Sequence, residues 1–201
     1  MSIAVALVAA YLLGSIPFAY LAGRLRGVDL RTVGSGNLGA TNVFRTLGRS
    51  WGIGVMVLDI AKGLVAVLLA RAITDDPWPL VAAGFAIAGH VFPVWLRFRG
   101  GKGVAVAAGC LIGLMPLVSL VLVVAWFAIV VTTRYVSVAS IACAVACAPL
   151  AALFGYPWSY VAFAGAASLA VLVRHRSNMR RLLRGEESRI TLGRGGRPRS
   201  A

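Results

Sequence analysis

Charged residues are scarce in this 201-residue chain, and acidic residues are the rarest of them. Asp, Glu, Lys and Arg together make up 13 % of the chain, whereas a soluble domain usually has roughly 25 %. Hydrophobic residues make up 60 %. This composition excludes a soluble globular domain, which needs a charged surface, and a disordered chain, which is poor in apolar residues. A polytopic membrane protein remains.

Cysteine is also rare. The three cysteines, Cys110, Cys143 and Cys147, all lie inside apolar runs. They form no Cys-x-x-Cys pair and show no spacing typical of metal ligands, so the sequence indicates neither a disulfide scaffold nor a metal centre. We expect three buried, small apolar side chains, no metal and no cofactor.

Long apolar runs dominate the rest of the chain. The run 104–133 is too long for one crossing, because a helix of that length would span about 45 Å against about 30 Å of hydrocarbon. Met115-Pro116 divides it, since the residue before a proline is biased away from the helix. We therefore predict an all-α polytopic membrane protein with about seven hydrophobic helices, one of them short. The expected helices lie near 2–23, 51–70, 80–96, 104–115, 116–132, 136–154 and 158–173.

Basic residues outnumber acidic ones by 20 to 6, and their placement predicts the orientation. They stand between apolar runs, so we expect no nucleic acid partner despite the positive charge. The positive-inside rule puts 24–50, 97–103 and 174–201 in the cytoplasm. The N-terminus is then outside and the C-terminus cytoplasmic. We expect one membrane-embedded domain over 1–190 and a basic, disordered tail over 191–201.

Each of these three basic regions is associated with a motif of glycines or polar residues. The first, 34–45, reads Gly-Ser-Gly-Asn-Leu-Gly-Ala-Thr-Asn-Val-Phe-Arg. Its small and polar residues leave backbone N–H groups free to surround a phosphate, and Arg45 can add a two-pronged contact. It also matches Gly-x-Gly-x-x-Gly, but no strand precedes it, so a dinucleotide site is not indicated. A flexible loop between helices is the alternative.

The second segment, 89–104, ends in Arg-Gly-Gly-Lys-Gly-Val. Glycines around Lys102 allow the backbone to approach a phosphate closely, and the ammonium group adds positive charge. It is not a Walker A loop, because Leu96 and Gly103 stand at the positions of that loop's first glycine and its Ser or Thr. A basic anchor at the membrane edge is the alternative, but it leaves the three glycines unexplained.

The third segment, 174–187, begins where the last apolar run ends. His175 and Asn178 are three residues apart and would share one helix face. A histidine there can carry a proton or bind a phosphate. An arginine-rich amphipathic helix on anionic lipid explains the same composition, and both interpretations stay open.

Three further polar residues, Asp59, Lys62 and His90, are expected to be structural. Charges in hydrocarbon are costly, so Asp59 and Lys62, which are three residues apart, should pair on one helix face. We expect His90 to hold the bend between Gly89 and Pro93.

Together the segments resemble the signature motifs of the bacterial acyl-phosphate:glycerol-3-phosphate acyltransferases, a resemblance that extends to about residue 190. Ser-Gly-Asn-x-Gly-Ala-Thr-Asn-x-x-Arg stands at 35–45. Gly-His-x-Phe-Pro and Phe-Arg-Gly-Gly-Lys-Gly-Val-Ala stand within 89–105. His-Arg-x-Asn-x-x-Arg-Leu-Leu-x-Gly-x-Glu stands at 175–187. The sequence departs from the family at Arg99, where lysine is usual, and at Val106, where threonine is common.

The resemblance implies an integral enzyme of the bacterial inner membrane with its active site on the cytoplasmic side. Such an enzyme moves the acyl group of acyl phosphate to the 1-hydroxyl of sn-glycerol 3-phosphate. The products are lysophosphatidic acid and phosphate, in the first step of phospholipid synthesis. The implied partners are these substrates, membrane lipid and a separate soluble enzyme that makes acyl phosphate.

The motif positions also imply residue roles. Catalytic roles fall to Ser35, Arg45, His175 and Asn178. Asp59, Lys62, His90, Arg181 and Glu187 would support the site structurally. Substrate binding falls to Gly36, Asn37, Gly39, Thr41, Asn42, Arg99, Gly100, Gly101, Lys102 and Gly103.

Two other functions are compatible with parts of this pattern. Acyltransferases that use thioesters typically show His-x-x-x-x-Asp, but Trp95 and Arg180 stand at the last position after His90 and His175, so direct use of acyl-CoA is not expected. A small transporter of organophosphate anions is the alternative function. It would need a site near the middle of the membrane, whereas the polar motifs here fall on one side.

Overall fold

The computed structural model describes residues 3–191 and contains helices and loops but no strand in that range. The predicted all-α fold is confirmed. The predicted tail, 191–201, lies outside the described residues except for Thr191. The described α-helices are α1 Ile3–Ser15, α2 Phe18–Leu25, α3 Ala40–Leu47, α4 Arg49–Ile73, α5 Trp78–Val91, α6 Val104–Leu114, α7 Pro116–Thr133, α8 Val136–Leu153, α9 Trp158–Arg174 and α10 Arg176–Leu183, with a 3-10 helix, η1, at Val94–Leu96.

Prolines divide three of the apolar runs, and in the helix predicted near 80–96 Pro93 stands between α5, which ends at Val91, and η1. The division at Pro116 is as predicted, since α6 ends at Leu114 and α7 begins at Pro116. The prediction of a single helix over 2–23 is wrong, because Pro17 separates α1 from α2. Proline has no backbone N–H to donate, so the hydrogen-bond ladder stops there. The break leaves the carbonyl of Ile16 free to accept a hydrogen bond from Lys62 at 2.8 Å.

Residues 3–191 contain five apolar segments of spanning length and two shorter ones, and the number that cross the membrane stays a prediction. Five are long and apolar enough to span a membrane: α1 with α2, α4, α5 with η1, α7 and α8. The other two are α6, with 11 residues, and α9, with 17 residues. Helix α9 is bounded by Pro157 at its start and by the charged Arg174 at its end. The orientation of the spans in a membrane stays a prediction.

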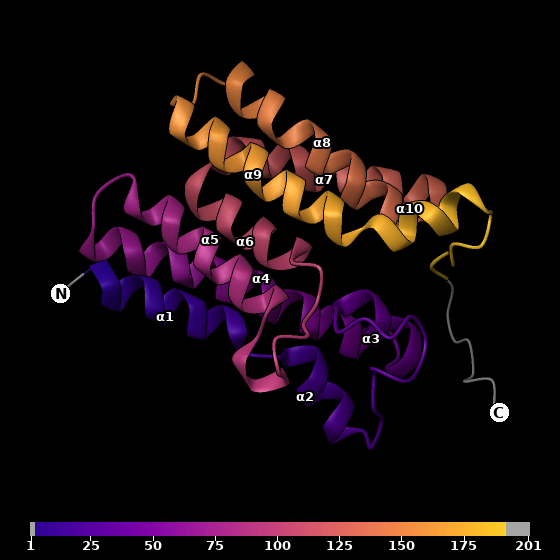
Figure 1. Cartoon of the computed structure of the whole chain (residues 1–201). Helices are drawn as coiled ribbons and strands as arrows, with labels where there is room; N and C mark the ends of the chain where they lie inside the picture. The colour runs from indigo at the N-terminus through magenta and orange to yellow at the C-terminus, as the bar shows by residue number, and fades with distance from the viewer. Residues whose placement is uncertain (1–2, 192–201) are drawn as a thin grey trace.

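The helices form two groups (Figure 1), and a cavity lies between them. Helices α1, α4, α5 and α6 pack closely together in one group, and α7, α8 and α9 form the other. A shared apolar core joins the groups where α6 turns into α7, and its members there include Met115, Val118, Ala151 and Ala164. Away from this junction, many of the residues with which the two helix groups face each other line the cavity.

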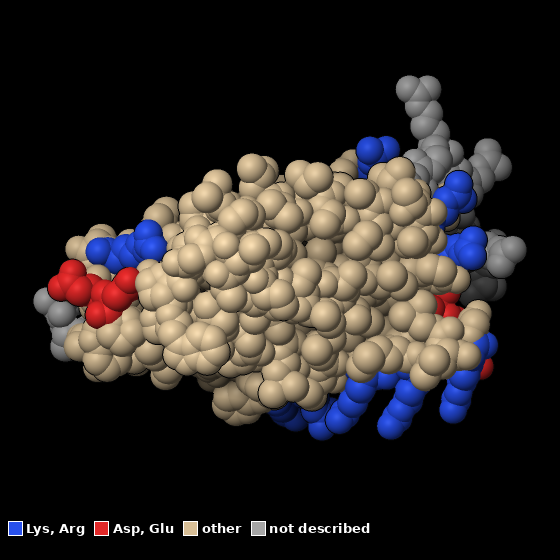
Figure 2. Space-filling view, turned by 90° about the horizontal axis from the view of Figure 1, so that it is seen from above, with Lys and Arg blue, Asp and Glu red and all other residues tan. Residues whose placement is uncertain are grey.

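Charged side chains gather at the ends and along one edge of the molecule. On the face seen in Figure 2 the broad middle shows none, as expected for a surface in contact with lipid. The amphipathic α3 and α10 both lie at the end where the cavity has its polar lining.

Glycines allow α4 and α6 to approach each other at backbone distance. A Cβ on Gly63 would lie 2.2 Å from the Val106 carbonyl oxygen, and a Cβ on Gly109 would lie 1.9 Å from that of Ile60. Both distances are far below van der Waals contact, so a side chain at either position would push the helices apart.

We therefore expect Gly109→Ala to lower the thermal unfolding midpoint by several degrees, since overpacking typically costs about 1–3 kcal/mol. Gly165→Ala in α9 is the matched control, because nothing lies within 4 Å of its would-be Cβ. The control should leave the midpoint unchanged or raise it, since alanine favours the helix by about 1 kcal/mol over glycine. Thermal unfolding of the purified protein in detergent measures both. An unchanged midpoint for Gly109→Ala would contradict the close packing.

Candidate active site

A cavity of about 250 Å³ lies between the two helix groups. Its apolar lining comes from the interior turns of α4, α6, α7, α8 and α9 and includes Ile60, Leu111, Leu122 and Phe163. Its polar lining comes from loops and helix ends. A molecule with a charged head and an apolar chain matches this division.

The first turns of four helices contribute to the polar lining. These are Gly39–Asn42 of α3, Gly103–Ala105 of α6, Val136 and Ser137 of α8, and His175 and Asn178 of α10. The first N–H groups of a helix have no partner within the helix, and the helix dipole places partial positive charge there. The end of the cavity is therefore suited to anions.

Asn42 holds the first loop in shape. Its Nδ2 donates to the carbonyls of Leu30 (3.1 Å) and Val33 (3.2 Å), and its Oδ1 accepts from the backbone N–H of Ser35 (2.9 Å). Gly34 has a φ of +61°, and a Cβ there would lie 2.2 Å from the Asn42 Oδ1. The glycine and the asparagine thus fix the loop that brings Ser35 to the cavity.

Arg45 lies on α3 at the edge of the cavity. One Nη2–H donates to the carbonyl of Ser188 at 2.7 Å, and the buried Nε has no hydrogen-bond partner among the described residues. Burial lowers the pKa of Arg45 from its usual value, although the nearby Glu187 opposes this. Arg45 remains a cation and can donate to an anion in the cavity.

The glycine loop between α5 and α6, residues 100–103, holds Lys102. The backbone N–H of Gly100 donates to Val91 and that of Gly101 to His90, at 3.0 and 3.2 Å. Gly103 has a φ of +84°, which favours glycine. Lys102 donates through Nζ to the Oδ1 of Asn178 on α10. Burial and the nearby cation of Arg181 lower the pKa of Lys102 to about 8.

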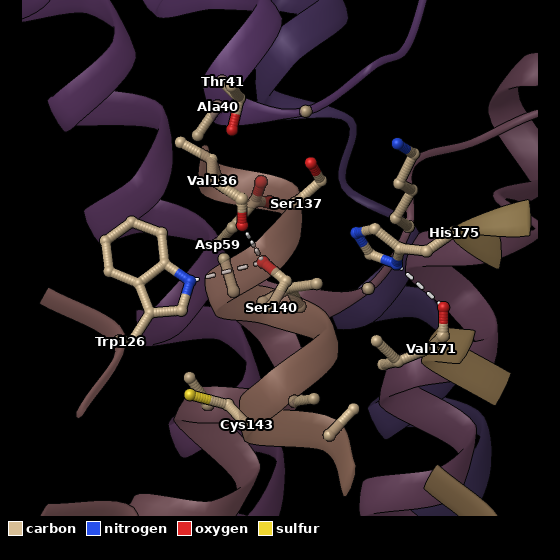
Figure 3. A pocket seen from close by; sticks show the side chains of 18 of the residues that line it. Ala40, Thr41, Asp59, Trp126, Val136, Ser137, Ser140, Cys143, Val171 and His175 are labelled. Atoms are coloured by element: carbon tan, nitrogen blue, oxygen red, sulfur yellow. Dashed lines mark hydrogen bonds between the residues drawn. The ribbon is translucent and has the colours of Figure 1, made fainter. Parts of the chain in front are cut away.

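His175 is neutral and has a defined tautomer. Its Nδ1 lies 2.8 Å from the Val171 carbonyl, which can only accept, so Nδ1 carries the proton and Nε2 is an acceptor. Figure 3 shows the second ring nitrogen on the side that faces the pocket. Burial is the main cause that lowers the pKa of His175 to about 4, and the cation of Lys102 adds to it.

Glu187 organises the third segment. It accepts hydrogen bonds from Asn178 Nδ2 at 2.6 Å and from Arg181 Nε at 2.7 Å. Burial by itself would raise the pKa of Glu187, but these donors hold it below its usual value. After Glu187 the chain reaches the turn between α7 and α8, where the backbone N–H of Ile190 donates to the Arg134 carbonyl at 2.8 Å.

The structure brings most of the predicted site residues to the cavity. The predicted residues in its lining are Ser35, Asn37, Gly39, Thr41, Asn42, Arg45, Asp59, His90, Lys102, Gly103, His175, Asn178 and Glu187. Those outside its lining are Gly36, Lys62, Arg99, Gly100, Gly101 and Arg181. No group of three or more His, Cys, Asp or Glu that could hold a metal ion occurs within residues 3–191. The functional role of each residue stays a prediction.

Several cavity residues did not stand out in the sequence. On α8, Ser140 donates to the Val136 carbonyl at 2.9 Å and accepts from Trp126 Nε1 at 3.3 Å (Figure 3). The buried hydroxyl of Ser137 lies near enough to Glu187 to influence its pKa but makes no hydrogen bond of normal geometry. The only sequence signal is that these serines open a helix after the Arg134-Tyr135 turn.

Comparison with known proteins now decides the family. The family model described as glycerol-3-phosphate acyltransferase matches residues 4–185. The chain belongs to the glycerol-3-phosphate acyltransferase family. A curated glycerol-3-phosphate acyltransferase of Desulforudis audaxviator is 47 % identical over 183 residues, which cover 90 % of this chain and 92 % of that protein. The corresponding protein of Aquifex aeolicus is 43 % identical, over 90 % of this chain and 95 % of its own length.

Two solved structures of an integral membrane glycerol 3-phosphate acyltransferase, PlsY, share this fold. Its glycerol 3-phosphate form has a TM-score of 0.91 and 39 % identity, and covers 95 % of this chain and 96 % of its own. Its lysophosphatidic acid form has a TM-score of 0.88 and 38 % identity, with the same coverage. The resemblance drawn from the three motifs is confirmed at the level of the family.

For this member of the acyltransferase family we predict that anion affinity falls above about pH 8, where Lys102 loses its proton. Sulfate is a suitable probe, because its charge is constant from pH 6 to 10. Its dissociation constant should rise by up to about tenfold per pH unit above the pKa of Lys102. Isothermal titration of the purified protein measures it.

Two variants serve as controls for this titration. Lys102→Arg should keep its affinity up to pH 10, since arginine does not deprotonate there. Lys102→Gln should bind weakly at every pH. A wild-type protein whose sulfate affinity does not change between pH 7 and 10 would contradict the assignment.

Proposed function

We propose that this chain transfers the acyl group of acyl phosphate to the 1-hydroxyl of sn-glycerol 3-phosphate and releases lysophosphatidic acid and phosphate. The observation that carries the proposal is the cavity, where Arg45, Lys102 and neutral His175 line the polar end of an otherwise apolar space. Each substrate has a phosphate for that end, and one also has an acyl chain for the apolar part. The forms in which PlsY was solved, with glycerol 3-phosphate and with lysophosphatidic acid, support the acceptor and the product.

Anion binding is divided between side chains and backbone. Within residues 3–191 the Nε of Arg45 has no hydrogen-bond partner, and Lys102 needs only to exchange Asn178 for a phosphate oxygen. The first N–H groups of α6 follow directly after Lys102. We assign these groups to the two phosphates, with Ser35 and Thr41 as further hydroxyl donors. Asn178 or Ser35 would stabilise the carbonyl oxygen as negative charge develops on it.

The transfer is a direct one. The 1-hydroxyl oxygen attacks the acyl carbon, the bond from that carbon to the phosphate oxygen breaks, and phosphate leaves with the electron pair. The hydroxyl proton passes to His175 Nε2 or to a substrate phosphate. A mixed anhydride has a good leaving group, so correct positioning and charge stabilisation carry most of the catalysis. No serine or cysteine hydrogen-bonds to His175 within residues 3–191, which favours transfer without an acyl-enzyme intermediate.

Two alternatives fit less well. The thioester motif is absent after His90 and His175, which disfavours acyl-CoA as donor. A transporter would place its polar groups near the midplane, whereas the cations of this cavity come from loops and helix ends on one side.

By the positive-inside rule we assign that side to the cytoplasm of a bacterial inner membrane, where a soluble enzyme would supply acyl phosphate.

The donor assignment is tested with purified protein in a lipid phase and labelled glycerol 3-phosphate. Acyl phosphate, acyl-CoA and acyl carrier protein are offered separately. We expect lysophosphatidic acid from acyl phosphate alone. Arg45→Ala should lose at least about 100-fold in rate through loss of a charged donor, whereas Arg24→Ala, an exposed arginine away from the cavity, should keep the wild-type rate. Product from a thioester would overturn the donor, and no product from any donor would favour the transporter.

The role of His175 is tested by the pH dependence of kcat/KM for glycerol 3-phosphate. A base must be neutral to accept a proton, so activity should fall as the pH drops through about 4, the pKa of His175. Glutamine cannot accept the proton, so His175→Gln should remove this acidic limb and lower the rate by about 100-fold or more. A variant that keeps both the limb and high activity would assign the proton to a substrate phosphate.

A further inference from the structure

Asp59, Lys62 and His90 form a buried cluster below the glycine loop, within the group of α1, α4, α5 and α6. Their exposed fractions are 1 %, 5 % and 9 %. Buried ionic groups are costly unless they are paired and hydrogen-bonded. The contacts of the cluster therefore decide what it does.

The ammonium group of Lys62 has three close partners. It donates to the Ile16 carbonyl at 2.8 Å, lies 3.0 Å from His90 Nδ1, and forms an ion pair with Asp59, whose Oδ1 is 2.7 Å away. These partners belong to three different parts of the fold, namely the break between α1 and α2, α5, and α4. Lys62 thus connects these three elements.

The contact with Lys62 also indicates which nitrogen of a neutral His90 ring carries the proton. Since the ammonium donates to Nδ1, a neutral His90 carries its proton on Nε2. That nitrogen lies against Gly101, where a Cβ would be only 2.3 Å from it and 2.6 Å from the Leu38 carbonyl. Gly100 fits as closely, since a Cβ there would lie 2.0 Å from the His90 carbonyl oxygen. The ring and backbone of His90 are therefore the surface on which the glycine loop rests.

The loop is held from its other side by the second helix group. Arg174, at the end of α9, donates through Nη2 to the carbonyls of Gly100 at 3.3 Å and Gly101 at 3.1 Å. Gly101 thus lies between His90 and Arg174, and the next residue is Lys102. A shift of Gly101 changes the position of the Lys102 ammonium group in the cavity.

We propose that Asp59, Lys62 and His90 are positioning residues for phosphate binding, acting through Gly101 to hold Lys102. Lys62 and Asp59 hold the His90 ring in place, and the contact between this ring and Gly101 sets the position of the glycine loop. Neither Lys62 nor Gly101 belongs to the cavity lining, so these two act through other residues. The proposal rests on the proposed function only in its choice of glycerol 3-phosphate as the anion.

The test compares His90→Phe with Gly84→Ala, which changes the same helix where nothing lies within 4 Å of the added Cβ. Phenylalanine keeps a ring but loses the acceptor for Lys62. We expect His90→Phe to raise the KM for glycerol 3-phosphate at least tenfold, with kcat and the KM for the acyl donor within threefold of wild type. His90→Gln, whose Oε1 can accept from Lys62, should recover at least half of this loss on a logarithmic scale. Gly84→Ala should change none of these constants.

Gly101→Ala tests the same contact from the side of the loop. It should raise the same KM, and combination with His90→Ala, which removes the obstructing ring, should give a KM no higher than that of the worse single variant. This coupling is the behaviour of two groups in contact. If His90→Phe does not fold, His90→Gln and the Gly101 series decide the proposal. A lower unfolding midpoint with an unchanged KM in these variants would overturn it.

Sulfate affinity separates this proposal from the proposed function. It should fall at least tenfold in His90→Phe and Gly101→Ala even if no donor gives product. Wild-type sulfate affinity in both folded variants would overturn the positioning role, whatever the reaction. Weakened sulfate binding together with an inactive wild type would overturn the acyltransferase assignment alone.

Discussion

Hydrocarbon does not solvate phosphate, and this constraint decides where the parts of the molecule lie. Moving an unpaired ion from water into a medium of low dielectric costs on the order of 20 kcal/mol in the ideal case. The phosphate contacts that we propose would therefore be made where loops and helix ends meet at the edge of the membrane, and the first turns of α3, α6, α8 and α10 line the cavity there. The apolar space between the helix groups continues directly from that point. The deeper charges of Asp59 and Lys62 are compatible with the same constraint because the two residues form an ion pair and Lys62 also contacts the Ile16 carbonyl and His90 Nδ1.

The sequence predicted a helix break correctly where two signals agreed, namely a proline and an apolar run too long for one crossing. Pro116 was recognised as a break because the run around it is too long for a single crossing. Pro17 carries the same local signal, yet the run 2–23 has the length of one span, so nothing called for a division. The broken helix matters, since the Ile16 carbonyl that it frees is an acceptor for Lys62. Length and hydropathy cannot show where such a carbonyl will find its donor.

The site was predictable to the extent that its residues lie in dense polar motifs. Lys102, His175 and Arg45 stood out because charge or imidazole beside small residues is unusual next to a membrane span. Ser137 and the carbonyl of Ser188 did not stand out, because their place at the site comes from packing between helices that are distant in sequence. Asn42 shows the opposite limit. Its position in the motif implied a substrate contact, but its side chain makes three hydrogen bonds that hold its own loop in shape.

Under the proposed function, the cations that we assign to phosphate would also keep His175 ready to accept a proton. Burial and the positive charge of Lys102 together hold the pKa of His175 near 4, so the ring is neutral at pH 7. A bound phosphate beside Lys102 would offset that positive charge and raise the proton affinity of Nε2. The substrate would thereby increase the basicity of the group next to it at the moment when the hydroxyl must lose its proton. If His175 is the base, as proposed, its pKa would therefore rise when the substrate binds, and the direction of that change follows from the charge of the substrate alone.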